Sequence, residues 1–321
     1  MILYIAKRLV MSVFVLLGVT LVTFILMNVV PGDPVLIMLG QDADPVIAAQ
    51  LRAELGMDRS LVVQYLSFVG NALQGDLGRS YFTGELVTEV VARRFASTAQ
   101  LALIAYAISV VVGVSIGVVS AINRGKWPDK TLMSLVVLFM AAPAFWVAMI
   151  LQIIFGLTLE VLPISGLYNP LIPTRFAPWQ FYILPCVALG LRFAASCARF
   201  TRTAMLDVIG QDYVRTARAK GLNEGVVIGS HAIKNALIPI ITLSGAQLGT
   251  LMTGAMLTET VFSIPGIGLL TVRSMLDRDL PMLQGCVIYI ASVFVITYLF
   301  VDILYTVIDP RMRVRSRKAV G

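Results

Sequence analysis

Six stretches of the sequence are long and apolar enough to cross a lipid bilayer as helices. They lie at about residues 9–30, 99–122, 131–157, 181–203, 236–258 and 283–308. A tilted transmembrane helix needs about 20 apolar residues, and each stretch reaches or approaches that length. Because lipid offers no hydrogen bonds to the backbone, continuous apolar runs of this length are typical of helices. We therefore expect an all-α integral membrane protein with six transmembrane helices.

The composition agrees with a membrane protein. Charged residues make up 13% of the chain, against about 25% in soluble domains. Cys186, Cys197 and Cys286 all fall inside apolar runs, which favours small buried side chains over disulfides or a zinc site. The first apolar run is too long for a signal-peptide core, so we expect no cleavable signal.

The distribution of lysine and arginine predicts the orientation. With the N-terminus inside, most of the cations fall on cytoplasmic segments, and most of the others fall in one long outer loop that weighs little in the rule. The sequence then predicts a first transmembrane helix at 1–30, an outer subdomain at 31–98 and a five-helix domain at 99–308. A cytoplasmic loop at 204–235 and a basic cytoplasmic tail at 309–321 complete the chain, with both termini in the cytoplasm.

The outer loop carries signals for short helices. A sharp exit from the membrane is expected at 31–34, which reads Pro-Gly-Asp-Pro. Asp44 before Pro45 is typical of a helix start, and Gly56 of its end. Ser60 is expected to cap the next helix, over 60–73.

The sequence shows no convincing catalytic set and no motif of a metal or cofactor site. It has neither the phosphate-binding motif GxxxxGK[ST] nor HExxH, and His231 is its single histidine. We expect no catalytic residues, no metal and no cofactor on this chain, and no nucleic-acid partner, because a net charge of +7 is common in membrane proteins with cationic loops.

A few positions within the spans stand out. Arg192 falls near the middle of the fourth span, where a charge usually faces a partner or a wet cavity, so it is a candidate for the translocation path or for an ion pair. Asp302 is expected to support packing and Glu160 to be solvated. Gly113 with Gly117, and Gly245 with Gly249, are GxxxG pairs suited to close helix packing, either within the helix bundle or against a second subunit.

The polar segment 207–235 interrupts the apolar pattern on the predicted cytoplasmic side. Thr216 to Lys220 are good helix formers, and Gly221 follows at a position typical of a helix end. A short rigid helix on this face would suit contact with a partner protein.

Four stretches, in order along almost the whole chain, resemble one family. Tyr213–Gly221 is similar to the EAA motif of permease subunits of binding-protein-dependent ABC importers, with Arg215, Thr216 and Ala217 in place of Glu-Ala-Ala. Pro31–Pro34 with Glu54–Asp58, Gln74–Ser80 and Thr258–Gly268 resemble the dipeptide/oligopeptide branch, which includes glutathione and nickel permeases.

The resemblance implies a fold of the ABC importer permease type and a non-catalytic subunit of the bacterial inner membrane that imports di- or oligopeptides. Its implied partners are a second homologous permease, two ATP-binding subunits that hold ATP and Mg, and an extracytoplasmic substrate-binding protein. The residues it implies for coupling to the ATPase are Tyr213, Arg215, Thr216, Ala217, Arg218, Ala219, Lys220, Gly221, His231 and Asn235.

Two other functions stay open at this point. The substrate could be glutathione, a nickel complex or another small solute. An autonomous secondary transporter would need its own ion site and commonly inverted repeats, and neither is evident in the sequence.

Overall fold

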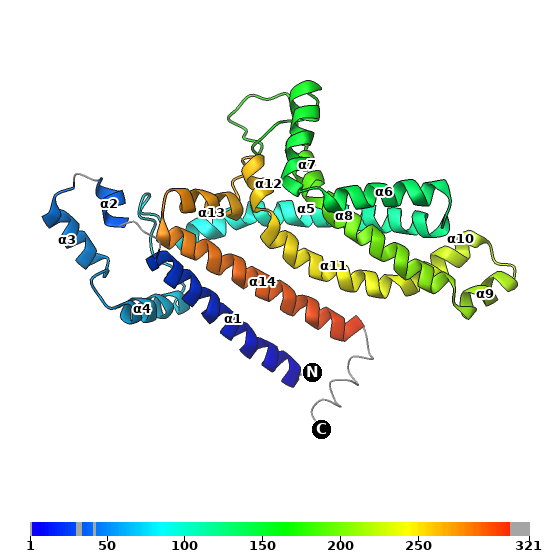
Figure 1. Ribbon diagram of the computed structural model, residues 1–321, viewed down its shortest axis with the longest axis horizontal. Coiled ribbons are helices and arrows are strands. Elements are labelled where there is room, and N and C mark those ends of the chain that lie inside the picture. The colour runs from blue at the N-terminus through cyan, green and yellow to red at the C-terminus, as the bar shows by residue number, and fades with distance from the viewer. Residues whose placement is uncertain (1, 30–33, 41–42, 309–321) are drawn as a thin grey trace. The chain divides into compact units, whose positions relative to one another are not determined.

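Helices form the regular structure of the protein. The computed structural model describes residues 2–29, 34–40 and 43–308, and within these ranges no strand forms beyond an isolated bridge between Arg79 and Leu86. The predicted turn at 31–34 lies outside the described residues except for Pro34, and so does the whole tail at 309–321. The expected all-α fold is confirmed, and Figure 1 shows the order of its helices.

Four of the described helices are long and apolar enough to span a membrane. They are α1 (Ile2–Val29), α5 (Val87–Ile122), α8 (Gln180–Ile209) and α14 (Leu280–Ile308). The predicted fifth span at 236–258 is occupied by α11 (Lys234–Gly254), a helix of 21 residues. α5 begins at Val87, well before the predicted start at 99. The count of six transmembrane helices stays a prediction.

The span expected at 131–157 is not one continuous helix, so this prediction is wrong in that respect. α6 (Trp127–Ala141) ends before Pro143, and the helix resumes as α7 (Ala144–Leu151) and the π-helix η1 (Gln152–Thr158) at an angle of 106° (Figure 1). Pro143 has no N–H to donate, and it forces Ala142 into an extended conformation with ψ 131°. Because the stretch is apolar on both sides of the bend, its composition gives no sign of the bend.

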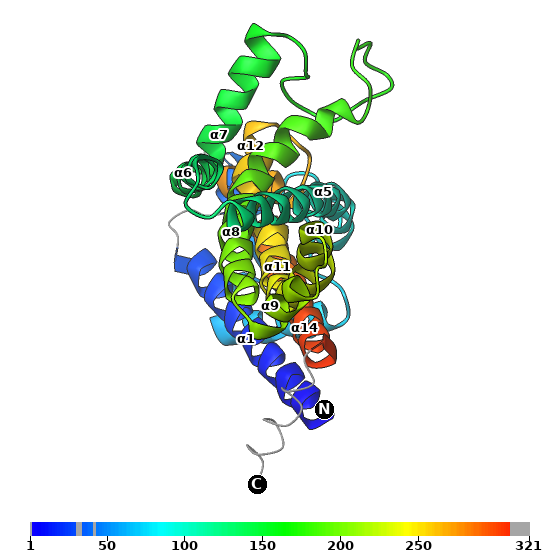
Figure 2. The same ribbon diagram turned by 90° about the vertical axis from the view of Figure 1, so that its right-hand side faces the viewer.

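The chain divides into two compact units, of which the first holds residues 99–264 and 296 onward. In it α6 and α11 each pack beside α8 (Figures 1 and 2). A buried cluster around Leu101 of α5, Leu189 of α8 and Leu251 of α11 joins these three helices to α12 (Met256–Val261). A second cluster, which includes Met205 and Ile228, joins α8 to residues of the polar segment.

Both GxxxG pairs are used inside this unit. A Cβ added at Gly113 would lie 2.6 Å from Cys197 Cβ, and one at Gly117 would lie 2.6 Å from the Ala198 carbonyl oxygen of α8. Gly245 and Gly249 of α11 approach Val301 and Tyr298 of α14 in the same way. These glycines therefore allow close helix packing within this chain, which is the first of the two uses expected from the sequence.

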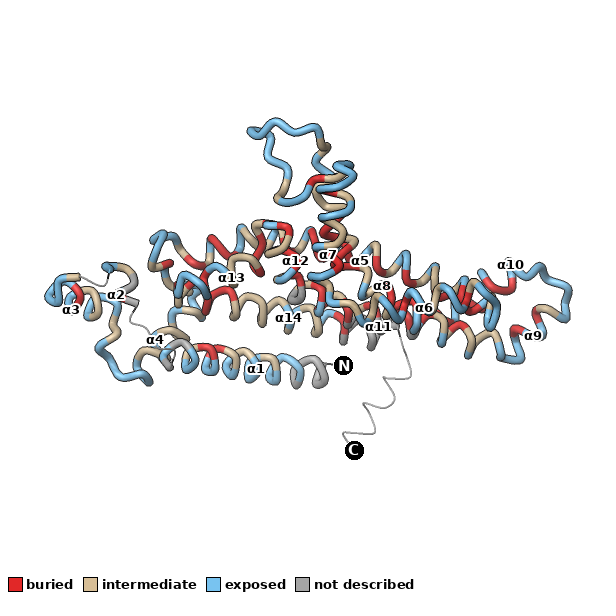
Figure 3. The backbone as a smooth tube through the Cα atoms, turned by 45° about the horizontal axis from the view of Figure 1, so that its top comes forward, coloured by how far each residue is buried: buried red, intermediate tan, exposed pale blue. Residues whose placement is uncertain are grey.

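The second unit holds residues 2–98 and 265–295. It includes α2 (Pro34–Leu39), α3 (Pro45–Glu54), α4 (Leu61–Leu73) and α13 (Ile267–Leu276). The Asp44 side chain accepts a hydrogen bond from the Val46 N–H, so the predicted cap is confirmed, whereas Ser60 makes no such bond. Most residues of α1 whose burial is described are exposed (Figure 3), as expected of a helix that faces lipid.

Candidate functional site

The polar segment forms a short helix with well-defined ends. After α8 the chain turns at Gly210 and enters α9 (Asp212–Ala219). Asp212 in the first turn and Arg218 in the last turn both match the helix dipole. Gly221 has a φ of +78°, a left-handed conformation that favours glycine and ends helices. The helix and its stop, both predicted from the sequence, are confirmed.

α9 has one buried face and one exposed face. Val214 and Ala217 are buried and pack with Val227 of η2 (Val227–Ile233) and with Val208 of α8. The exposed face carries Tyr213, Arg215, Thr216, Ala219 and Lys220. Figure 3 shows that exposed residues predominate around α9. Because its buried side chains contact the end of α8 directly, a displacement of α9 would be passed to that long helix.

Arg218 has a different environment from the other cations of α9. Its Nη2 and Nε donate to the Glu224 carboxylate at 2.7 and 3.1 Å, across the Gly221 turn. These hydrogen bonds hold the pKa of Glu224 below its ordinary value. The Asn223 side chain accepts from the Gly225 N–H at 2.9 Å and starts α10 (Glu224–Val226). Arg218 therefore stabilises the turn. Arg215 and Lys220 are exposed, and Arg215 Nη1 lies 3.8 Å from the Asp212 carboxylate in an exposed ion pair.

His231 and Asn235 lie after this turn. His231 is half-buried in η2, and Asn235 at the start of α11 donates to the His231 carbonyl oxygen at 2.8 Å. η2 contacts α9 through Val227, but these two residues are not on the exposed face of α9. Among the described residues, no group of His, Cys, Asp and Glu could hold a metal ion.

The structure does not bring Arg192 to the α9 site. Arg192 is exposed on α8, about 25 Å along the helix axis from the end at Ile209. It forms no ion pair with any residue within the described ranges. Asp302 lies on α14, and its side chain is outside the described residues. The translocation role of Arg192 stays a prediction.

A buried ion pair next to this site could not be identified from the sequence. Asp129 in the first turn of α6 accepts from Arg202 Nε at 2.7 Å and from Arg202 Nη2 at 2.8 Å. It also accepts from the Ser120 hydroxyl of α5 and from the Gly125 N–H. One carboxylate thus fastens the α5–α6 turn to α8 (the Asp129 latch). One feature of the sequence could have pointed to this pair, because Asp129 is the single acidic residue between the predicted spans 99–122 and 131–157.

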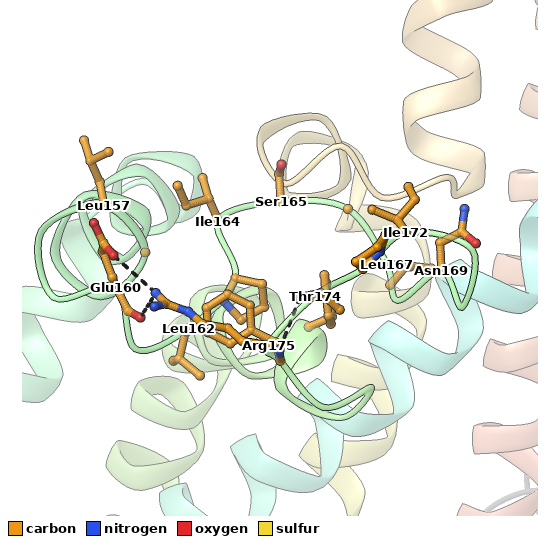
Figure 4. A pocket seen from close by; sticks show the side chains of 16 residues that line it. Leu157, Glu160, Leu162, Ile164, Ser165, Leu167, Asn169, Ile172, Thr174 and Arg175 are labelled. Atoms are coloured by element: carbon orange, nitrogen blue, oxygen red, sulfur yellow. Dashed lines mark hydrogen bonds and ion pairs between the residues drawn. The ribbon is translucent and has the colours of Figure 1, made fainter.

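The loop from η1 to α8 encloses a cavity of about 540 Å³ (Figure 4). Arg175 Nη2 donates to the Glu160 carbonyl oxygen at 2.6 Å and contacts its carboxylate at 3.3 Å. Glu160, expected to be solvated, is exposed but paired. The Gly166 N–H donates to the Phe262 carbonyl oxygen at 2.7 Å and holds the loop against the end of α12.

Comparisons with known proteins agree with this architecture. Residues 110–314 match the family model described as binding-protein-dependent transport system inner membrane component, and residues 1–102 match the N-terminal model of such membrane components.

Two bacterial relatives match over nearly their whole length. A peptide transport system permease protein of Brucella abortus is 40% identical over 309 residues, 96% of this chain and 98% of the relative. The glutathione transport system permease protein GsiC of Pectobacterium atrosepticum is 40% identical over 310 residues, 97% and 98% of the two chains.

Two solved structures are also similar. An amino acid ABC transporter matches with a TM-score of 0.50 at 17% identity, over 70% of this chain and 94% of that one. The methionine transporter MetNI matches with a TM-score of 0.47 at 18% identity, over 72% and 96%. The amino acid transporter supports the fold alone. The two family models together cover most of the sequence, and the chain belongs to the family of binding-protein-dependent transport system inner membrane components.

Proposed function

We propose that the chain is the membrane-spanning permease subunit of an ATP-driven importer for di- and oligopeptides, and that α9 is its contact with an ATP-binding subunit. The observation that carries this proposal is the geometry of α9. It is a short helix with an exposed cationic face, ended by Gly221, and its buried face rests on α8 and η2. A rigid lever of this kind transmits a displacement, which a flexible loop would absorb.

The mechanism assigns different tasks to different subunits. Two ATP-binding subunits hold ATP and Mg, and their closure moves α9 of this chain and of a second homologous permease. The movement shifts the membrane helices between outward-open and inward-open states. A substrate-binding protein brings the peptide to the outer face, and both termini of this chain lie in the cytoplasm of a bacterial cell.

The relatives support the substrate class. One is named for peptide transport and the other for glutathione transport, at the same identity to this chain. Glutathione is itself a short peptide, so both names agree on a small substrate with peptide bonds and carboxylates. Competition of unlabelled tripeptides and of glutathione against uptake of a labelled tripeptide would distinguish the two.

The test of coupling uses Gly221. The transporter is reconstituted with its partners in vesicles, and peptide uptake and ATP hydrolysis are measured together. Gly221→Val places a β-branched residue at φ +78°, a conformation that such residues avoid. We expect uptake to fall at least about tenfold while ATP hydrolysis continues. A loss of about 1.4 kcal/mol of free energy at the coupling contact is enough for a tenfold change.

Gly229→Val is the matched control. Gly229 is exposed in η2, has no positive φ, and has no atom within 4 Å of an added Cβ. This variant should keep both uptake and hydrolysis. Unchanged uptake in Gly221→Val, at normal expression, would contradict the assignment of α9. Charge reversal of Lys220 should also uncouple uptake from hydrolysis.

A further inference from the structure

A second, larger cavity lies in the unit formed by residues 2–98 and 265–295. Its volume is about 910 Å³, within the range of small-molecule sites. α1, α4, the start of α14 and the two segments 54–59 and 76–84 form its walls. α1 and α4 are fixed to each other, because the Thr20 and Tyr65 hydroxyls are 3.1 Å apart and the Phe24 and Tyr65 rings are 5.4 Å apart.

The first charged wall is the turn after α3. Gly56 has a φ of +68°, and the Gln64 amide of α4 donates to the carbonyl oxygens of Met57 at 3.1 Å and Arg59 at 2.7 Å. This arrangement fixes the backbone that carries Glu54 and Arg59. Neither of these side chains bonds to another residue in the part of the chain that the structure describes, so both charges are available to a ligand.

The second charged wall is the segment before α5. Asp76 accepts from the Gly78 N–H at 2.8 Å, and Arg79 donates to the Gly84 carbonyl oxygen at 3.0 Å. The Ser80 hydroxyl donates to Asp279 at 2.5 Å and ties the segment to the residues before α14. This wall, like the first, presents one carboxylate and one guanidinium on a backbone held by side chains.

Apolar side chains also line the cavity. Phe24, Phe68, Leu280 and Pro281 contribute to it. Gln284 of α14 also lines the cavity, and its Nε2 is buried with no acceptor among the described residues. A buried donor without a partner is costly, so an acceptor supplied from the cavity, by a ligand or by a water it holds, would stabilise this region.

We propose that this cavity binds a short zwitterionic peptide, with the carboxylate toward Arg59 and Arg79 and the ammonium group toward Glu54 and Asp76. A ligand with charges of a single sign could pair with only two of these four groups, and the other two would stay unmatched. A peptide supplies both signs, backbone carbonyl acceptors and apolar side chains. The identity of the ligand as a peptide rests on the proposed function, whereas the matching of the two charge signs rests on the cavity itself.

The experiment measures equilibrium binding of tritiated trialanine to the purified transporter in lipid nanodiscs without its substrate-binding protein. We expect saturable binding that the blocked analogue N-acetyl-trialanine-amide does not compete for. Arg59→Gln should weaken binding at least about tenfold, the usual effect of losing a charge-assisted hydrogen bond. Glu54→Gln should have an effect of similar size.

Arg93→Gln is the matched control, since Arg93 is an exposed arginine of the same unit that pairs with Glu85 at 3.0 Å and does not line the cavity. It should leave the affinity unchanged, and equal melting temperatures would show that all variants fold. Absence of saturable binding, or equal affinity of wild type and Arg59→Gln, overturns the proposal. Attachment of the substrate-binding protein to the same nanodiscs is measured separately. If Arg59→Gln weakens that attachment and leaves trialanine binding unchanged, the surface is a protein contact and the proposal is also overturned.

ATP-driven uptake of trialanine with the binding protein present separates this inference from the proposed function. Uptake without binding in the cavity refutes the inference and leaves the importer assignment intact. Cavity binding as expected, without ATP-driven uptake of any peptide, refutes the importer assignment and leaves the inference standing.

Discussion

The Asp129 latch gives a sharp prediction about stability. The Asp129 side chain is 6% exposed and that of Arg202 is 27% exposed. Replacing Arg202 with leucine would leave a buried carboxylate with two of its four hydrogen bonds, those from Ser120 and Gly125. Breaking a buried pair by removing one partner typically costs about 3–5 kcal/mol. Because two bonds remain and Arg202 is partly solvated, we expect Arg202→Leu to cost about 2–3 kcal/mol.

The assay is thermal unfolding of the purified transporter in detergent. A loss of about 2–3 kcal/mol corresponds to a melting temperature lower by about 4–12 °C, at about 2–4 °C per kcal/mol. The double variant Asp129→Leu/Arg202→Leu should recover part of this loss, because it buries no unpaired charge.

Arg93→Leu is the control for charge removal alone. Arg93 and Glu85 also form an ion pair, at 3.0 Å, but their side chains are 65% and 50% exposed. Exposed pairs contribute about 0–1 kcal/mol. If Arg202→Leu lowers the melting temperature no more than Arg93→Leu does, the latch is not a buried ion pair of the folded protein, and the reasoning is refuted.

Two other predictions concern helix packing and the turn after α9. Gly117→Val should separate α5 from α8, because its Cβ would lie 2.6 Å from the Ala198 carbonyl oxygen; overpacking of this kind costs about 1–3 kcal/mol, seen as a lower melting temperature. An unchanged melting temperature would contradict the close approach. The Arg218–Glu224 bond should stabilise the turn at pH values above 4.5, the ordinary pKa of Glu224, and be lost as pH falls through its lowered value in the folded protein. Hydrogen exchange of the turn against pH measures this, and Glu224→Gln should remove that pH dependence; if the wild type and this variant respond alike, the pair does not hold the turn.

Much of the fold could be predicted from the sequence, because membrane burial leaves a direct signal in composition. The long apolar runs, the Asp44 cap and the Gly221 stop follow from local rules about length, proline and glycine. The break at Pro143 was missed because an apolar run keeps its length even where the helix bends by 106°.

The side-chain pairings could not be predicted, because they join residues far apart in the sequence. Asp129 and Arg202 are separated by 73 positions, and only packing of α6 on α8 brings them together. Arg218 is a different case, because its partner Glu224 is only six positions away, across the turn at Gly221. The contact of Arg218 with an ATP-binding subunit stays a proposal. The exposed residues of α9 lie in the stretch that resembles the family motif, and their contact with an ATPase stays a proposal.

Chemical cross-linking from α9 tests the central claim most directly. The three native cysteines are buried, so Arg215→Cys provides a single accessible thiol for a maleimide-benzophenone reagent. Photolysis in the assembled transporter should join this chain to the ATP-binding subunit. Leu171→Cys, at an exposed position of the loop before α8, should not give that product. Cross-linking from Leu171→Cys but not from Arg215→Cys would contradict the account.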